Sequence, residues 1–318
     1  MAGTKRLNLA VRNGFYSNHQ WLPLVIIGVA ALLQTLFFIY WDQAKWYSLI
    51  NLLLLLMAVS IWAAQRFEQI FIADVHRNLS INKATDSGMI TEADIAPLPM
   101  PVQQYIRYSG ALNRPQLYNM RITFEGKMRA KGKDWFPFTT LQYNFFQQPT
   151  RLFFMKARMW GIKVPGYHHY ENARATMDVK LFGLFSVVKA QGRLMDKAET
   201  VTLFNDMCLL APGSLIDKRI QWQPIDDRSA QAVFTNGNIT ISAILYFNGQ
   251  GQLVNFVCDE RYDVNSQREY RFSTPVMAYT SIGGYRVLQT GNAVWHYPDG
   301  AFEYGQFILK DIAYNVTA

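Results

Sequence analysis

Hydrophobic residues form two long runs near the N-terminus. Residues 21–41, WLPLVIIGVAALLQTLFFIYW, contain no charged residue, and an α-helix needs about 20 such residues to cross the ~30 Å hydrocarbon core of a bilayer. Residues 46–64 repeat the pattern, and Trp41, Trp46 and Tyr47 stand where interfacial aromatic residues are expected. The pattern predicts a transmembrane helix hairpin over residues 21–64. A signal peptide is the alternative for the first run, which is longer than a typical signal core.

Basic residues next to the two runs predict the orientation of this hairpin. Three of them precede the first run (Lys5, Arg6, Arg12), three follow the second (Arg66, Arg77, Lys83), and Lys45 lies between the runs. Since basic residues are enriched on the cytoplasmic side of membrane spans, both termini are expected in the cytoplasm.

After the second run the chain becomes polar and then rich in proline. The segment APLPMP at 96–101 predicts a stiff extended linker, and residues 102–110 predict a short amphipathic helix that ends at Gly110. The expected organisation is a cytoplasmic tail (1–20), a transmembrane hairpin (21–64), a juxtamembrane segment and linker (65–110) and a folded domain (111–318).

Period-two alternation dominates the folded domain. In residues 121–131 every second side chain is apolar, and NITISAILYF at 238–247 repeats the pattern before the turn NGQG. Further strands are expected at 135–147, 151–160, 167–178, 181–190, 229–236, 268–280 and 301–315. The fold class is therefore mainly β, with about ten to twelve antiparallel strands.

Residues 196–211 interrupt this alternation with helical spacing. Asp196 and Glu199 resemble a capping box, and Pro212 with Gly213 ends the element. Cys208 falls inside the apolar arc and is expected to be a buried core thiol. Asp206 is expected to face solvent or a partner at a strand end, and Asn205, on the border of the arc, to bond to backbone where the sheet opens. One helix is therefore expected to pack on the sheet.

Composition and charge narrow the class of protein. The 318 residues are 50% hydrophobic and only 17% charged, with a net charge of +8, which favours a membrane protein. Lys127, Arg129 and Lys131 share one strand face, which either is solvated or lies on anionic lipid headgroups. No recognition motif accompanies the charge, so nucleic acid is not an expected partner.

Motifs for catalysis and metal binding are weak in this chain. His168 and His169 point to opposite faces of a strand, although His169 and Glu171 share one, and the two cysteines lack metal-ligand spacing. The best remaining acid–base candidate is the charged cluster Asp259, Glu260 and Arg261, together with Asp226 and Asp227, although a salt bridge at a strand end explains Arg261 more simply. A hydrolase would be expected to depend on Asp206 or Asp259. We predict no catalytic residue, no metal site and no cofactor.

Several scattered segments together resemble a known family. VTLFNDMCLLAPGSLID, RIQWQPID, NITISAILYFNGQGQLVNF, YRFSTPV and WHYPDG with FEYGQFILKDIAYN look like a family of uncharacterised bacterial proteins that carry a domain of unknown function. The resemblance covers about residues 98–316 and transfers no catalytic residue. It implies the curved, incompletely closed β-barrel of lipoprotein-carrier and related lipid-binding proteins, with a helix on the concave side, in a multi-pass protein of the bacterial inner membrane.

Such a half barrel leaves an apolar surface that a lipid or acyl chain can occupy. The residues expected to bind this ligand are Phe145, Phe154, Trp160, Phe182, Phe204 and Asn205. The alternative for the aromatic residues is a closed core. The expected function is therefore binding of a hydrophobic ligand, or of a partner, at the membrane surface. An unrecognised hydrolase and a pure protein-interaction module remain as alternatives.

Overall fold

The computed structural model describes residues 21–82, 88–159 and 161–317. The chain divides into two compact units. One unit consists of Met1–Ile70 and Leu181–Phe185, and the other consists of Phe71–Lys180 and Ser186–Ala318. Lys5, Arg6, Arg12, Lys83 and Trp160, which the sequence singled out, lie outside the described residues.

The first unit contains helix α2 (Leu22–Ile39) and most of helix α3 (Trp41–Ile81). Both helices are long and apolar enough to cross a membrane, as judged by length and composition. Only Tyr40 separates them, so residues 42–45, expected in the turn, are helical. The helix α3 runs on to Ile81 because no glycine or proline interrupts residues 41–81.

Polar side chains join α2 to α3 within this apolar pair. The Asn51 amide donates hydrogen bonds to the Ala30 carbonyl at 2.8 Å and to Gln34 Oε1 at 3.0 Å. Gln34 Nε2 in turn donates to Ser48 Oγ at 2.5 Å. Such contacts between small and polar residues are typical of helix pairs in hydrocarbon.

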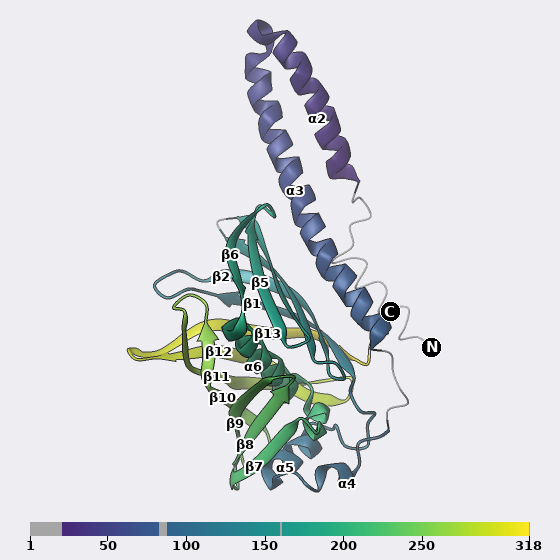
Figure 1. Ribbon diagram of the computed structural model, residues 1–318, viewed down its shortest axis with the longest axis vertical. Coiled ribbons are helices and arrows are strands. Elements are labelled where there is room, and N and C mark those ends of the chain that lie inside the picture. The colour runs from purple at the N-terminus through teal and green to yellow at the C-terminus, as the bar shows by residue number, and fades with distance from the viewer. Residues whose placement is uncertain (1–20, 83–87, 160, 318) are drawn as a thin grey trace. The chain divides into compact units, whose positions relative to one another are not determined.

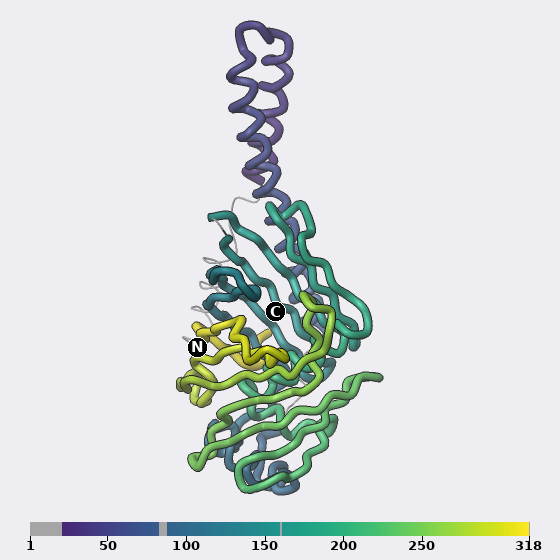
Figure 2. Tube along the Cα trace, turned by 90° about the vertical axis from the view of Figure 1, so that its left-hand side faces the viewer, coloured from purple at the N-terminus to yellow at the C-terminus, as the bar shows by residue number. Residues whose placement is uncertain are grey.

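The second unit is built on one antiparallel sheet of 13 strands in the order β6-β5-β4-β3-β2-β1-β13-β12-β11-β10-β9-β8-β7 (Figure 1). The strands are β1 (Asn119–Met128), β2 (Phe136–Phe145), β3 (Thr150–Met159), β4 (Ile162–Glu171), β5 (Arg174–Leu181), β6 (Phe185–Gln191), β7 (Ile220–Asp226), β8 (Ser229–Asn236), β9 (Ile239–Phe247), β10 (Leu253–Asp263), β11 (Arg268–Ile282), β12 (Tyr285–Tyr297) and β13 (Gly300–Tyr314). Figure 2 shows that the strands drawn in teal and those drawn in green run in clearly different directions, as expected of a strongly twisted sheet.

Helix α6 (Arg193–Leu210) crosses from one edge of this sheet to the other. With the 3₁₀ turn Pro212–Ile216 it connects β6 to β7, which are the two edge strands. The sheet curls around α6 as a half barrel (Figure 1), and the apolar face of the helix packs inside it, with Phe204 stacked on Phe234 at 5.1 Å. The predicted curved antiparallel sheet with one packed helix is confirmed.

The number of strands exceeds the expected ten to twelve for local reasons. Residues 167–178, expected as one strand, contain a turn at Asn172 and Ala173, whose φ angles are 53° and 56°. The strand β7 was not predicted because Pro224 interrupts its alternation, which is tolerated at a sheet edge. The strand β12 contains Gly291 at a position where β11 is irregularly paired, which weakens its pattern.

The last turns of α3 cover the outer face of the half barrel. Phe71 lies 5.4 Å from Phe154 and 5.5 Å from Tyr167, measured between ring centroids. The Tyr167 hydroxyl donates to Asp74 at 2.9 Å, and Arg77 forms an ion pair with Glu171. The outer face of β3 and β4 is therefore buried around Phe154 and Tyr167.

Two short helices, α4 (Glu92–Ile95) and α5 (Met100–Tyr108), occupy the segment expected to be an extended linker and a short helix. The short helix is confirmed. Residues 96–101 are not extended throughout, because Pro101 lies in the first turn of α5, where a missing N–H is tolerated. The buried Tyr105 hydroxyl donates to the Cys208 carbonyl at 2.8 Å, which ties α5 to α6.

Candidate ligand cavity

A cavity of about 80 Å³ lies between α6 and the concave face of the sheet. Its apolar lining consists of Phe124, Phe153, Leu209, Leu210, Phe272, Leu288, Gly291, Ala293 and Phe307. Its polar lining consists of Gln142, Arg151, Thr202, Asn205, Asp206, Arg261, Thr274 and Tyr304. The cavity thus brings together α6 and strands from both arms of the half barrel.

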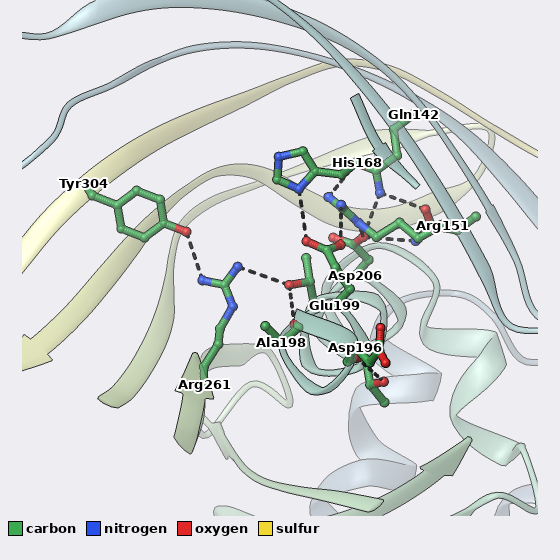
Figure 3. Close-up of polar contacts among 12 residues, drawn as sticks. Gln142, Arg151, His168, Asp196, Ala198, Glu199, Asp206, Arg261 and Tyr304 are labelled. Atoms are coloured by element: carbon green, nitrogen blue, oxygen red, sulfur yellow. Dashed lines mark hydrogen bonds and ion pairs between the residues drawn. The ribbon is translucent and has the colours of Figure 1, made fainter. Parts of the chain in front are cut away.

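A buried ionic cluster forms the β2–β3 side of the cavity. The carboxylate oxygen Oδ2 of Asp206 accepts three hydrogen bonds, from Gln142 Nε2 at 2.7 Å, Asn144 Nδ2 at 3.0 Å and Arg151 Nε at 2.7 Å. Arg151 Nη1 also donates to Glu199 at 3.1 Å. We call Gln142, Asn144, Arg151, Glu199 and Asp206 the Arg151 cluster (Figure 3).

Glu199 is ionised within this cluster although it is 2% exposed. Burial by itself raises the pKa of Glu199, but the Arg151 charge and the hydrogen bond with His168 Nδ1, at 3.0 Å, outweigh burial and lower the pKa to about 2. A carboxylate with this pKa does not take up a proton near neutral pH. Glu199 and Arg151 therefore act as a structural ion pair on one wall of the cavity.

Arg261 forms the opposite wall and reaches the cavity through a β-bulge. Cys258 pairs with Phe272 and Arg261 pairs with Tyr270, so two residues of β10, Asp259 and Glu260, oppose one of β11, and β10 has one extra residue. Without the bulge, alternation would turn the side chain of Arg261 to the face opposite Cys258. The irregular pairing instead aims Arg261 at the concave face.

The guanidinium of Arg261 is held by aromatic rings and neutral hydroxyls. Its central carbon lies 4.2 Å from the ring centroid of Phe272 and 5.0 Å from that of Trp295. It donates to the Tyr304 hydroxyl and to Thr202 Oγ1, each at 3.1 Å (Figure 3). Its buried Nε has no hydrogen-bond partner, and no ion pair joins Arg261 to a carboxylate among the described residues.

The structure places the residues expected to bind a ligand at different sites. Asn205 lines the cavity and donates to Thr274 Oγ1 at 3.1 Å, a side chain rather than the expected backbone. Phe145, Phe154 and Phe204 are buried in packed core and are not part of the cavity lining. Phe182 lies in the turn between β5 and β6, in the unit that contains the apolar helices, and is 39% exposed.

The basic residues expected at the membrane surface lie beside exposed or half-buried aromatic rings. Lys127 Nζ is 5.0 Å from the ring centroid of Trp135, and the Arg129 guanidinium is 4.4 Å from it. Lys131 lies over Tyr297 at 4.9 Å. Lys127, Arg129 and Lys131 thus form a cationic and aromatic surface of the second unit.

The other chemical candidates have structural partners. Asp196 does not cap α6, which begins at Arg193, and instead accepts a hydrogen bond from the Ala175 amide at 2.6 Å. His169 Nε2 lies 3.4 Å from Glu171, and no group of three metal-binding side chains occurs among the described residues. Cys208 is buried, as expected, and burial raises the pKa of its thiol.

The model of a family of unknown function, DUF6544, matches residues 88–307, which is well over half of the chain. The chain belongs to the DUF6544 family. No curated protein matches it. The family assignment confirms the resemblance inferred from the sequence, and the whole cavity lining lies within the DUF6544 match.

Solved structures resemble this DUF6544 protein at very low sequence identity. A DUF1329 family protein from Desulfovibrio piger has a TM-score of 0.40 and 10% identity, over 70% of this chain and 95% of that one. A LolA superfamily protein from Nitrosomonas europaea has a TM-score of 0.38 and 9% identity, over 66% and 92%. A putative outer membrane lipoprotein-sorting protein domain from Vibrio parahaemolyticus has a TM-score of 0.37 and 8% identity, over 62% and 84%.

Sequence reasoning missed most of the residues that line the DUF6544 cavity. Phe272, Tyr304 and Phe307 lie on strands whose two faces both carry aromatic residues, so alternation does not identify the inner one. Arg151 carried a usable signal, since an arginine two residues before Phe153 shares the face of a strand that is otherwise apolar. A charged residue on such a face needs a buried partner.

Proposed function

We propose that this protein is a membrane-anchored DUF6544 domain that binds a hydrophobic ligand, a lipid or an acyl chain, without catalysing a reaction. The observation that carries the proposal is the cavity between α6 and the concave face, which has nine apolar and eight polar lining residues. This combination is typical of small-molecule sites, in which apolar groups supply affinity and polar groups fix orientation.

The chemistry of the titratable groups in and next to the cavity favours binding over catalysis. The pKa of Glu199 is lowered to about 2 by Arg151 and His168 despite burial, so this carboxylate is a poor proton acceptor near neutral pH. Asp206 is held by three donors on one oxygen. Burial raises the pKa of Cys208, which keeps the thiol protonated and unreactive.

The volume of the cavity limits the size of the ligand that it can hold in this conformation. Its 80 Å³ is about half of the ~150 Å³ that encloses a benzene molecule in an engineered cavity. The cavity therefore accepts a headgroup or chain end of a few heavy atoms, and a longer chain requires α6 to separate from the strands. Each methylene of the ligand that becomes buried contributes about 0.8 kcal/mol, which offsets the cost of separating α6 from the strands.

In this proposal, the helix pair α2 and α3 anchors the protein in the membrane. Their apolar side chains are widely exposed, with Leu32 71% and Trp46 73% accessible, and such surfaces are stable in lipid. We place the protein in a bacterial inner membrane with its C-terminal domain in the cytoplasm. In this arrangement Lys127, Arg129 and Lys131 contact anionic headgroups, at about 1 kcal/mol per residue.

Photo-crosslinking tests the proposed function on the full chain. The protein is reconstituted in phospholipid nanodiscs, incubated with a long-chain alcohol that carries a diazirine and an alkyne, irradiated and digested. The expected result is labelling of α6 and β11–β13 peptides, and competition by the unlabelled alcohol. Labelling confined to residues 22–64 would show that the probe meets the protein only in the bilayer and would overturn the proposal.

A cavity-filling substitution and a matched control show whether the labelling comes from the cavity. Ala293 lines the cavity and is 4% exposed, so Ala293→Ile places three additional carbon atoms in it. Ala278→Ile adds the same atoms on β11 at a half-buried position outside the cavity lining. Ala293→Ile is expected to reduce cavity labelling at least fivefold, and Ala278→Ile to leave it unchanged.

A further inference from the structure

The guanidinium of Arg261 lies in the wall of the cavity and forms no direct ion pair with a carboxylate among the described residues, although its charge helps to lower the pKa of the nearby Glu199. Arg151, on the opposite wall, forms ion pairs with Glu199 and Asp206, whereas the hydrogen bonds of Arg261 go to the neutral hydroxyls of Thr202 and Tyr304. A guanidinium carries five N–H donors, and the described residues provide partners for two of them. Arg261 thus retains N–H donors that a ligand in the cavity can use.

The surroundings of Arg261 make this charge unusual. Phe272 and Trp295 lie against the guanidinium at 4.2 Å and 5.0 Å, and the Nε atom is buried without a partner. Aromatic rings stabilise a cation less than a paired carboxylate does, and an unpartnered charged donor away from water is costly. The β-bulge that turns Arg261 inward is a second departure from regular structure at the same position. Both features favour a role for this side chain in ligand binding.

We infer that the ligand is an amphiphile with a carboxylate headgroup, such as a long-chain fatty acid, whose carboxylate pairs with Arg261. The inference rests on the proposed function and names the class of ligand. A carboxylate presents two oxygen atoms to two parallel N–H donors of a guanidinium, and this geometry is strong and specific. Apolar residues next to Arg261, Phe272 and Phe307 among them, then contact the first methylenes.

The charged residues of the cavity favour a ligand with one negative charge over a ligand with two. Asp206 lines the same cavity, and its carboxylate is already satisfied by Arg151, Gln142 and Asn144. A carboxylate ligand brings one negative charge near Asp206 and Glu199, whereas a phosphate monoester brings up to two, so repulsion from these carboxylates disfavours the phosphate more. The 80 Å³ volume also suits a small headgroup.

The test compares three photoreactive amphiphiles with the same chain: a fatty acid, a fatty alcohol and an alkyl phosphate. Each is titrated into the full chain in nanodiscs, and labelling of the cavity peptides is measured. The wild-type protein is expected to reach half-maximal labelling with the acid at a concentration at least tenfold below that for the alcohol or the phosphate, as charge-assisted hydrogen bonds allow.

Variants then assign the preference to Arg261. Arg261→Gln is expected to remove the difference between acid and alcohol, and Arg261→Lys to keep part of it, since the lysine retains the charge but not the fork of donors. Arg271→Gln is the matched control, because Arg271 is an exposed arginine on β11 that pairs with Asp259 outside the cavity. Each variant is compared with the wild type for both probes, which cancels differences in membrane partition.

The outcomes separate the two proposals. Equal labelling of the wild-type cavity by acid and alcohol overturns the carboxylate inference and leaves the proposed function in place. Stronger labelling by the phosphate assigns a different headgroup and also overturns the inference. Absence of cavity labelling by all three probes overturns the proposed function itself. The comparison among probes in the wild type needs no variant, so a poorly folded Arg261 variant does not decide the result.

Discussion

Replacing Arg151 with methionine tests whether the Arg151 cluster is the buried ionic structure described above. The substitution keeps much of the side-chain volume but leaves Glu199 and Asp206, which are 2% and 8% exposed, without their cation. Removing one partner of a buried ion pair typically costs about 3–5 kcal/mol, because the other charge remains buried. We expect Arg151→Met to lower the free energy of unfolding by this amount.

The lowered pKa of Glu199 agrees in direction with this expectation. Its pKa is lowered from 4.5 to about 2, with Arg151 as the largest of the stabilising partners that overcome burial. At 1.36 kcal/mol per pH unit, the charged form of Glu199 is stabilised by about 3 kcal/mol in the folded protein. Urea unfolding of the full chain in detergent micelles, followed by tryptophan fluorescence, measures the effect.

The control variant is Arg158→Met, on the same strand at an exposed position, which is expected to change the free energy of unfolding by less than about 0.5 kcal/mol. Adding Glu199→Gln to Arg151→Met should recover about 0.5–3 kcal/mol, since the two residues are in contact. A loss below about 1 kcal/mol for Arg151→Met would refute the reasoning, because it would mean that water or protonation already compensates the two carboxylates.

Further predictions follow from burial and charge. Glu199 has a lowered pKa, so its contribution is fully present above pH 4.5 and is lost as the pH falls toward 2; urea titrations should show this loss of about 3 kcal/mol, and its absence in Glu199→Gln. Phe71→Ala should cost about 3–5 kcal/mol in the same assay, and the exposed Ile70→Ala less than 0.5. Burial raises the pKa of the Cys208 thiol, so a maleimide should modify it only after denaturation, as detected by mass spectrometry. Modification of native Cys208 would contradict the packing of α6.

Hydrophobic periodicity predicted the architecture because most elements follow it locally. The β1 segment alternates strictly, and its inner residues Ile122 and Phe124 are 0% and 5% exposed. The α6 segment switches from period two to helical spacing, which made it visible as the one exception. Curvature of the sheet was implied only by the resemblance to a family.

The cavity was less predictable because it depends on contacts between distant segments. Arg261 reaches the interior through a bulge, and the pattern around 259–261 instead suggested a salt bridge at a strand end. Asp206 has the expected partner near a strand end, since Arg151 is the second residue of β3, but the pair is buried rather than solvated. Phe154 was expected in a groove and packs on the outer face against Phe71, because alternation alone does not tell which face of a sheet is concave.

The polar contacts of α6 determine on which side the half barrel can admit a ligand. The Tyr170 hydroxyl of β4 forms a hydrogen bond with Thr200 Oγ1 of α6 and accepts a second hydrogen bond from the Asn236 amide of β8. These two hydrogen bonds connect both arms of the sheet to the helix. On the β3 side, separating α6 from Arg151 exposes a buried ion pair at a cost of several kcal/mol. On the β10–β11 side, Thr202 and Asn205 of α6 bond with Arg261 and Thr274, at about 0.5–3 kcal/mol each. Lys197 of α6 also forms ion pairs with Glu260 and Glu269, and such partly exposed pairs contribute about 0–1 kcal/mol each. The polar contacts on the β10–β11 side, the wall that contains Arg261, are therefore easier to break than the buried Arg151 pair, and the packing of Phe204 on Phe256 of β10 is what opposes separation there.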